Sequence, residues 1–217
     1  MNVEQARFNM VEQQIRPWDV LDTAVLALLL EVKRERFVPP GAEGLAFADL
    51  EIPLGHGESM MAPKLEARIL QELAVKPGDA VYEVGTGSGY LTALLAKRAR
   101  TVTSVEIHAD LAARARGNLA AAGLSNATVL EGDGARAPLG ETSWDVIVLT
   151  GSTPVLPDAF AARLNPGGRL LAIVGEAPVM QAVLVERDAG GDLRRTGLFE
   201  TMVKPLVNAE TPSRFRF

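Results

Sequence analysis

Glu83-Val84-Gly85-Thr86-Gly87-Ser88-Gly89-Tyr90 is the stretch that decides the fold. It follows a short apolar run at residues 80–84 and precedes a helical pattern at residues 91–98, which predicts a strand, a glycine loop and a helix. Glycines in such a loop can adopt positive φ and let a ligand approach the backbone without meeting a Cβ atom. In an open parallel sheet, ligands bind beyond the carboxyl ends of the strands. The stretch therefore predicts a ligand site where this strand ends.

The alternation of strand and helix continues along the chain. The predicted strands are residues 80–84, 101–105, 127–130, 146–149 and 170–174, and the predicted helices are residues 91–98, 111–122 and 157–164, with a turn at residues 165–168. Residues 127–130 and 146–149 are expected to be buried. Because this alternation gives parallel strands joined by right-handed crossovers, we expect an α/β fold: a Rossmann-like, doubly wound, mostly parallel sheet. Asp188-Ala189-Gly190-Gly191-Asp192 separates two further strand patterns and predicts a C-terminal antiparallel hairpin.

Residues 1–75 predict a helical N-terminal extension. Asp22 is a suitable N-cap for a helix through Lys33, and Pro63 opens another helix through Leu73. Residues 47–63 carry prolines and glycines and predict irregular structure.

We expect a single domain over residues 1–217. Residues 1–75 would cover substrate and cofactor, residues 76–180 would form the cofactor-binding core, and residues 181–217 would form the hairpin and a tail. The aromatic residues at the end of the tail, Phe215 and Phe217, fit packing on the sheet or against a second subunit.

The composition excludes several kinds of chemistry. The chain has 217 residues, no cysteine and two histidines, which rules out disulfides and cysteine nucleophiles and predicts no metal site. The net charge of −5 argues against broad nucleic-acid binding. The first residues lack the apolar core of a signal peptide, and the sequence contains no membrane span, so we expect a cytoplasmic protein. Nothing in the sequence predicts the oligomeric state.

The spacing of the glycines distinguishes between ligands. They follow the pattern G-x-G-x-G, not the G-x-G-x-x-G of dinucleotide-binding loops, and no P-loop lysine follows. Glu106, at the end of the next strand, is placed to accept both ribose hydroxyls, and Asp133, after the third strand, is placed to accept the adenine amine. Together these positions predict an adenosyl cofactor. The candidate cofactor-binding residues are Gly85, Thr86, Gly87, Ser88, Gly89, Tyr90, Glu106, Ile107, Asp133, Gly134 and Thr150.

The two histidines are weaker candidates. His56 is predicted to be a loop residue that makes a hydrogen bond, not a catalytic base. His108, two positions after Glu106, fits either a place beside the adenosine or an exposed one.

Several motifs resemble those of a known family. They are Met10-Val11-Glu12-Gln13-Gln14-Ile15-Arg16, Glu35-Arg36-Phe37-Val38-Pro39, Pro53-Leu54-Gly55-His56-Gly57, Lys76-Pro77-Gly78-Asp79 and Leu164-Asn165-Pro166-Gly167-Gly168-Arg169-Leu170, together with the glycine loop. As a set they resemble the protein-L-isoaspartate O-methyltransferases, within the Rossmann-like enzymes that use S-adenosylmethionine. The resemblance implies methylation of the carboxyl group of L-isoaspartyl residues in damaged proteins, so the expected partner is a peptide or protein that carries a carboxylate.

The chain departs from the family pattern beside the expected reaction centre. Ser59 keeps a hydroxyl where the family has threonine, but Met61 stands where the family has the serine that lies beside the reacting carboxylate. The end of the fourth predicted strand also departs from the family, which usually has small residues there, whereas this chain has Thr150-Gly151-Ser152-Thr153-Pro154. On the resemblance, Ser59 and Met61 are the candidate catalytic positions. A thioether cannot donate a hydrogen bond. Our hypothesis is that Met61 marks either weakened repair activity or a more apolar acceptor.

The mechanism needs few catalytic groups. A carboxylate is already ionised at neutral pH, so no general base is required, and the enzyme mainly supplies proximity and alignment. Three other readings stay open: a methyltransferase of this fold with a different acceptor, a non-catalytic module that binds S-adenosylmethionine, and a nicotinamide dehydrogenase, which the glycine spacing disfavours.

Overall fold

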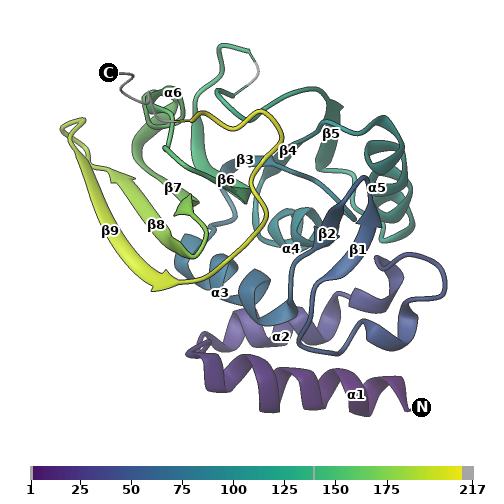
Figure 1. Ribbon diagram of the computed structural model, residues 1–217. Coiled ribbons are helices and arrows are strands. Elements are labelled where there is room, and N and C mark those ends of the chain that lie inside the picture. The colour runs from purple at the N-terminus through teal and green to yellow at the C-terminus, as the bar shows by residue number, and fades with distance from the viewer. Residues whose placement is uncertain (1, 139, 212–217) are drawn as a thin grey trace.

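A seven-stranded sheet forms the centre of the computed structural model, which describes residues 2–138 and 140–211 (Figure 1). The strand order is β5-β4-β3-β6-β7-β8-β9. Neighbouring strands from β5 to β7 pair in parallel, and β8 and β9 continue the sheet in antiparallel fashion. The strands are β3 Ala80–Val84, β4 Thr101–Glu106, β5 Ala127–Glu131, β6 Trp144–Thr153, β7 Leu164–Glu176, β8 Val179–Arg187 and β9 Leu193–Glu200. The predicted fold class is confirmed, including the C-terminal hairpin.

The strand order also locates the ligand crevice. From β3 the chain moves outward through β4 and β5, then returns to the other side of β3 with β6 and β7. The winding direction therefore reverses between β3 and β6, and in open α/β sheets the crevice lies at this reversal, beyond the carboxyl ends of the strands.

Both faces of the sheet are covered, as the alternation of side chains along each strand requires. On one face, Val81, Val146 and Leu171 join a large apolar cluster with the helices α1 to α5. On the other, Tyr82, Ile147 and Leu170 pack in a smaller cluster with Phe160 of α6. The helices are α1 Val3–Met10, α2 Thr23–Glu31, α3 Pro63–Leu73, α4 Tyr90–Arg98, α5 Ala109–Ala121 and α6 Asp158–Ala162.

Local signals explain where two of these helices begin. The Asp22 carboxylate accepts hydrogen bonds from the amides of Ala24 and Val25, at 2.8 and 3.2 Å, and so caps α2 as predicted. Pro63 is the first residue of α3, where a missing N–H costs nothing. Short helical turns connect α1 to α2 and α2 to the next strand. They are a π-helical turn at Val11–Ile15 and 3₁₀ turns at Arg16–Trp18, Arg34–Arg36 and Glu43–Leu45.

Three local predictions were wrong. Residues 47–63 are not irregular throughout, because β1, Ile52–Gly55, and β2, Glu58–Met60, form an antiparallel hairpin whose turn contains His56 and Gly57 with positive φ. β5 is not buried: as an edge strand it buries only Val129. The turn at residues 165–168 is an interruption within β7, where the register against β6 jumps from Trp144↔Leu164 to Val146↔Arg169.

A segment that we call the strap, residues 201–208, follows β9 and crosses back over the carboxyl ends of the strands (Figure 1). It is fastened to β6 by backbone hydrogen bonds, from the Ser152 amide to the Lys204 carbonyl at 3.0 Å and from the Leu206 amide to the Ser152 carbonyl at 2.9 Å. At the end of the strap, the side-chain amide of Asn208 donates to Asp133 at 2.8 Å. The strap therefore forms part of the wall around the crevice. The predicted packing of Phe215 and Phe217 lies outside the described residues.

Within residues 2–138 and 140–211, no helix is long and apolar enough to span a membrane, and no group of three or more His, Cys, Asp or Glu side chains could hold a metal ion.

Candidate functional site

The glycine loop leaves β3 in a conformation that side chains would obstruct. Gly85, Gly87 and Gly89 all have positive φ, at +92°, +53° and +82°. A Cβ atom on Gly85 would lie 2.2 Å from the Thr150 hydroxyl, which itself lies 2.9 and 2.8 Å from the carbonyls of Val84 and Gly85. Thr150 thus fixes the loop from the neighbouring strand β6. The backbone here can adopt its path only with glycine at position 85.

Glu106 ends β4 with its carboxylate held in place. The side chain is 4% exposed, and its two oxygens accept from the amides of Gly87, at 2.8 Å, and His108, at 3.1 Å. Each carboxylate oxygen retains a further lone pair. A buried, oriented carboxylate at the end of a strand is suited to accept hydrogen bonds from a ligand's hydroxyl groups.

Asp133 lies past β5 and is similarly fixed. One oxygen accepts from the amide of Ala135 at 3.0 Å, and the other accepts from the Asn208 side chain at 2.8 Å. The strap therefore contacts Asp133, the residue predicted to accept the adenine amine. Gly134 is close-packed, since a Cβ there would meet Val84 at 3.3 Å.

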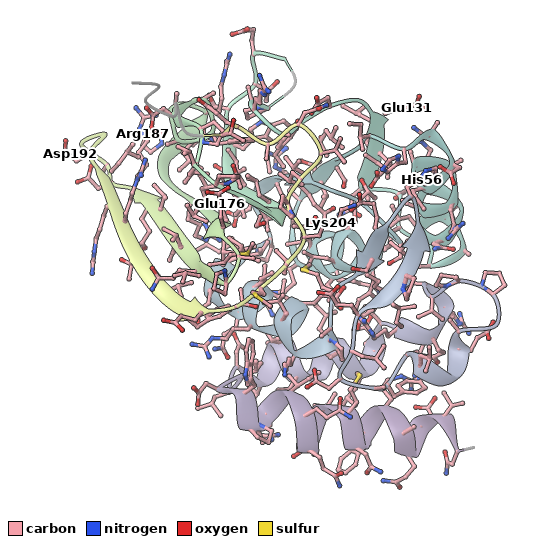
Figure 2. The ribbon with its side chains drawn as sticks, in the orientation of Figure 1. His56, Glu131, Glu176, Arg187, Asp192 and Lys204 are labelled. Atoms are coloured by element: carbon pink, nitrogen blue, oxygen red, sulfur yellow. The ribbon has the colours of Figure 1, made fainter. Side chains whose placement is uncertain are left out.

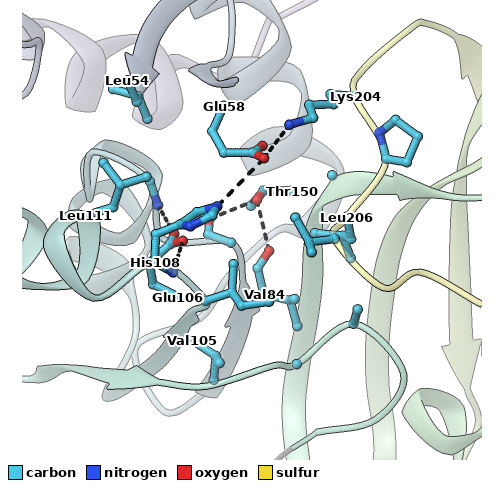
Figure 3. A pocket seen from close by; sticks show the side chains of 18 of the residues that line it. Leu54, Glu58, Val84, Val105, Glu106, His108, Leu111, Thr150, Lys204 and Leu206 are labelled. Atoms are coloured by element: carbon cyan, nitrogen blue, oxygen red, sulfur yellow. Dashed lines mark hydrogen bonds and ion pairs between the residues drawn. The ribbon is translucent and has the colours of Figure 1, made fainter. Parts of the chain in front are cut away.

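One cavity brings most of the predicted site residues together (Figure 3). The cavity opens to solvent, and the centre of a water molecule can reach about 100 Å³ of it. The predicted residues that line it are Ser59, Met61, Gly85, Gly87, Glu106, Ile107, Asp133, Gly134 and Thr150. Residues that sequence analysis did not assign to the site complete it: Leu54, Glu58 and Leu111, and Val203 to Val207 of the strap.

The remaining predicted residues lie elsewhere. Thr86, Ser88 and Tyr90 line a smaller cavity beside the loop, together with Glu66 and Met61. Gly89 lines neither cavity. It precedes α4 and packs against α5, where a Cβ would lie 3.3 Å from that of Ala115. Successive residues of the loop therefore point to different surroundings, and only Gly85 and Gly87 line the larger cavity.

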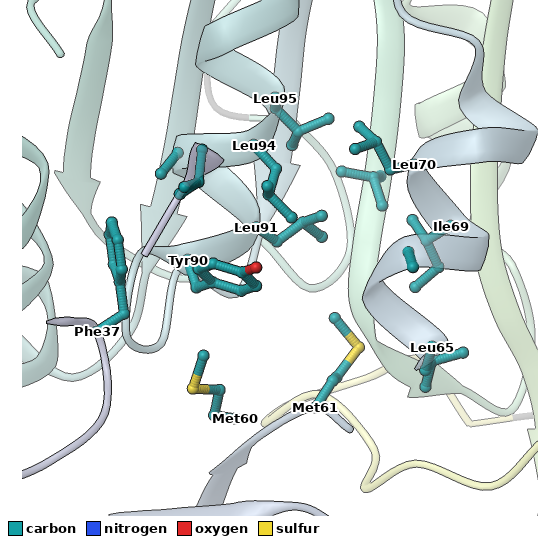
Figure 4. Close-up of a cluster of buried hydrophobic side chains, with 14 of the residues drawn as sticks. Phe37, Met60, Met61, Leu65, Ile69, Leu70, Tyr90, Leu91, Leu94 and Leu95 are labelled. Carbon is teal, nitrogen blue, oxygen red and sulfur yellow. The ribbon is translucent and has the colours of Figure 1, made fainter. Parts of the chain in front are cut away.

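Ser59 and Met61 adjoin the large cavity but differ in their surroundings. The Ser59 hydroxyl donates to the Glu51 carboxylate at 2.7 Å. Met61 is 8% exposed and belongs to the same buried cluster as Leu65, Tyr90 and Leu91 (Figure 4). Its carbonyl accepts from Arg34 at 2.7 Å. Met61 therefore helps to fill the core as well as to line the site.

Two buried carboxyls lie under the loop. Glu66 forms an ion pair with the buried Arg34. Glu83, in β3, accepts a hydrogen bond from Thr92 at 2.5 Å, and its second oxygen has no partner. Burial raises the pKa of Glu83 to about 7; the nearby hydroxyls of Ser104 and Thr92 oppose this shift, and the carboxylates of Glu66 and Glu106 add to it.

The two histidines stack at the rim of the cavity. Their rings lie 4.2 Å apart and nearly parallel. His56, in the β1–β2 turn, hydrogen-bonds to Asp110 of α5 at 2.9 Å, which lowers the pKa of that carboxyl, and His56 is thus a loop residue with a hydrogen bond, as predicted. His108 lines the cavity, and its Nε2 lies 3.9 Å from Glu58. Of the two positions expected for His108, the structure therefore favours the one at the ligand site.

These features define a class of protein. The parallel sheet has a glycine loop after its central strand, a fixed carboxylate at the end of the next strand and a second carboxylate after the strand beyond that. All three features surround one cavity. This is the arrangement of the Rossmann-like methyltransferases. Within that class, the family model for protein-L-isoaspartate(D-aspartate) O-methyltransferase matches residues 5–211. The chain belongs to this family, which confirms the predicted resemblance.

Individual relatives agree. A protein-L-isoaspartate O-methyltransferase of Anaeromyxobacter dehalogenans is 44% identical over 87% of this chain and 91% of the relative. One of Methanoculleus marisnigri is 41% identical over 84% of this chain and 83% of the relative. A Plasmodium falciparum chain described as a protein-L-isoaspartate O-methyltransferase, crystallised with S-adenosyl-L-homocysteine, superposes with a TM-score of 0.80 over 93% of this chain and 98% of that one, at 21% identity. At that identity the likeness concerns the fold.

Proposed function

We propose that this protein transfers a methyl group from S-adenosylmethionine to the free carboxyl of L-isoaspartyl residues in damaged peptides and proteins. The observation that carries the proposal is the glycine loop and Glu106 around one cavity, in a chain that belongs to the isoaspartyl methyltransferase family. The names of the curated relatives support the same acceptor.

The residues around the cavity fit the cofactor. Gly85 and Gly87 offer backbone without side chains, and a Cβ on either would fill space now occupied by Thr150 or Leu54. Glu106 supplies an oriented acceptor for ribose hydroxyls, and Asp133 supplies one for an amine. Accordingly, the residues we assign to the cofactor are Gly85, Gly87, Glu106, Ile107, Asp133, Gly134 and Thr150; Thr86, Ser88, Gly89 and Tyr90 shape the loop.

The chemistry asks the protein to bind, orient and exclude water. S-adenosylmethionine supplies a methyl group on a positively charged sulfur, ready for in-line displacement. The acceptor carboxylate is ionised at neutral pH and needs no base. Alignment of two bound reactants can supply up to roughly 7–11 kcal/mol of the barrier. Leu54, Met61 and Leu206 line the cavity with apolar surface and so keep water from the reacting groups.

Met61 supports a second candidate: a methyltransferase of the same family with a more apolar acceptor. The observation that favours it is the buried thioether in place of a hydroxyl beside the site. For either acceptor we propose a single-domain enzyme that acts in the cytoplasm on peptides or proteins, without nucleic acid; its net charge of −5 supports the last point.

The decisive assay is methyl transfer from labelled S-adenosylmethionine to a synthetic isoaspartyl peptide, with the ordinary aspartyl peptide as control. We expect a base-labile methyl ester on the isoaspartyl peptide alone. No ester, from protein that binds S-adenosylhomocysteine, would refute the isoaspartyl acceptor and favour the second candidate.

A further inference from the structure

An acceptor carboxylate needs hydrogen-bond donors in the cavity, and the hydroxyl groups there are already engaged. The Ser59 hydroxyl donates to Glu51 at 2.7 Å. The Thr150 hydroxyl is directed to the carbonyls of Val84 and Gly85. Met61 has no proton to donate. The described residues that line the large cavity therefore offer the acceptor no free side-chain hydroxyl, and the unpartnered Tyr90 hydroxyl lies in the smaller cavity.

The cavity is also strongly anionic. Four carboxylates line it, those of Glu51, Glu58, Glu106 and Asp133. Among the described lining residues, Lys204 is the single lysine or arginine. A carboxylate that enters this cavity would meet repulsion from every charged side chain except this one.

Lys204 is held at the mouth of the cavity with donor capacity to spare. Its ammonium, on the strap, donates to the Gly57 carbonyl at 3.1 Å and pairs with Glu58, across from the β1–β2 hairpin (Figures 2 and 3). An ammonium has three N–H donors, so one remains. The side chain is 44% exposed, which leaves that donor accessible to a ligand.

We propose that Lys204 is a specificity-determining residue that binds the carboxylate of the acceptor. The inference rests on the proposed carboxyl methylation. The Glu58 carboxylate holds the ammonium over the cavity, and His108 lies 3.9 Å from the same Glu58 oxygen with an unpartnered Nε2. When Lys204 turns to the acceptor, the His108 ring therefore still lies next to Glu58. The ammonium of Lys204 thus donates the hydrogen bond to the acceptor carboxylate that a hydroxyl at position 61 would otherwise donate.

Kinetics with a series of isoaspartyl peptide concentrations tests this, at saturating S-adenosylmethionine. We expect Lys204→Met to raise the peptide KM roughly tenfold, the size of one charge-assisted hydrogen bond, with kcat and affinity for S-adenosylhomocysteine within about twofold. Lys204→Arg should restore most of the loss. The matched control is Lys97→Met, which removes an exposed lysine that pairs with Glu31 on the surface, and its KM should stay at the wild-type value.

Glu58→Gln separates acceptor binding from a purely structural link between strap and hairpin. If Lys204 binds the acceptor, losing the Glu58 charge frees the ammonium, and the peptide KM stays level or falls. If Lys204 only ties the strap down, Glu58→Gln and Lys204→Met raise KM together, and the proposal is overturned. A KM for Lys204→Met within twofold of wild type, with ester still formed, would refute the role of Lys204 alone. Failure of the wild-type enzyme to form ester would refute the proposed function, and this inference with it.

Discussion

The buried carboxyl of Glu83 makes the stability of the protein depend on pH in an unusual direction. The side chain is fully buried in β3, with one oxygen bonded to Thr92 and the other without a partner. Its pKa lies near 7, whereas the ordinary value is 4.5. Replacing it by the isosteric amide, Glu83→Gln, removes the ionisation and keeps an oxygen that Thr92 can bond.

The magnitude follows from the difference in pKa between the folded and unfolded states. Between pH 4.5 and about 7 the folded protein keeps a proton on Glu83 that the unfolded chain releases. The free energy of unfolding therefore falls as pH rises through this window, and the Glu83 contribution to the fall is about 3 kcal/mol. It is complete above pH 7. Glu83→Gln should thus gain about 3 kcal/mol relative to wild type between pH 4.5 and pH 8.

Urea unfolding at a series of pH values from 4.5 to 8 measures this, with the free energy of unfolding compared between wild type and variant at each pH. Glu131→Gln is the control, because it removes an exposed carboxyl from the end of the edge strand β5 (Figure 2). A wild type and a Glu83→Gln variant whose stabilities change in parallel across the range would refute the reasoning.

Three further outcomes are expected. Gly85→Ala should destabilise the protein and weaken S-adenosylhomocysteine binding, because φ of +92° costs an alanine roughly 1–2 kcal/mol and its Cβ would lie 2.2 Å from the Thr150 hydroxyl. Adding Thr150→Ala should recover part of the lost stability, and no recovery would contradict the clash. Met61→Ser should lower the free energy of unfolding in urea by roughly 2–4 kcal/mol, whereas Met61→Leu should lower it by less than about 1.5 kcal/mol. Unchanged turnover of Met61→Ser on an isoaspartyl peptide would reject a role for this position in activity. Glu106→Gln should weaken S-adenosylhomocysteine binding roughly tenfold or more in calorimetry, since a charged acceptor is lost, and an unaltered affinity would exclude Glu106 from the site.

The sequence predicted the parts of the fold that local chemistry determines. The glycine loop could be located because its glycines lie between an apolar run and a helical pattern, and Asp22 and Pro63 marked helix starts. Glu106 could be assigned because it ends a strand next to β3. In each case a few neighbouring residues carry the information.

The features that sequence analysis missed depend on contacts between distant segments. The β1–β2 hairpin was hidden because Pro53, Gly55 and Gly57 resemble breakers, whereas a register shift between Pro53 and Gly55 accommodates them. Nothing local marks the strap as a wall of the site, since its position depends on Ser152 in β6. Lys204 becomes a candidate only once the strap has placed it opposite Glu58.

The strap is the last part of the site to be synthesised. The hydroxyl of Ser152 donates to the carbonyl of Val203, a residue that the ribosome adds 51 positions later. Synthesis proceeds from the N-terminus, so β3, β4 and β6 are made before the strap. A growing chain can therefore pair β3 with β4 and β6 while one wall of its ligand cavity has yet to be made. We expect the nascent protein to form its sheet first and to acquire affinity for its cofactor only when translation has passed residue 208. A stop codon between residues 200 and 208 would leave most of the architecture and little of the binding.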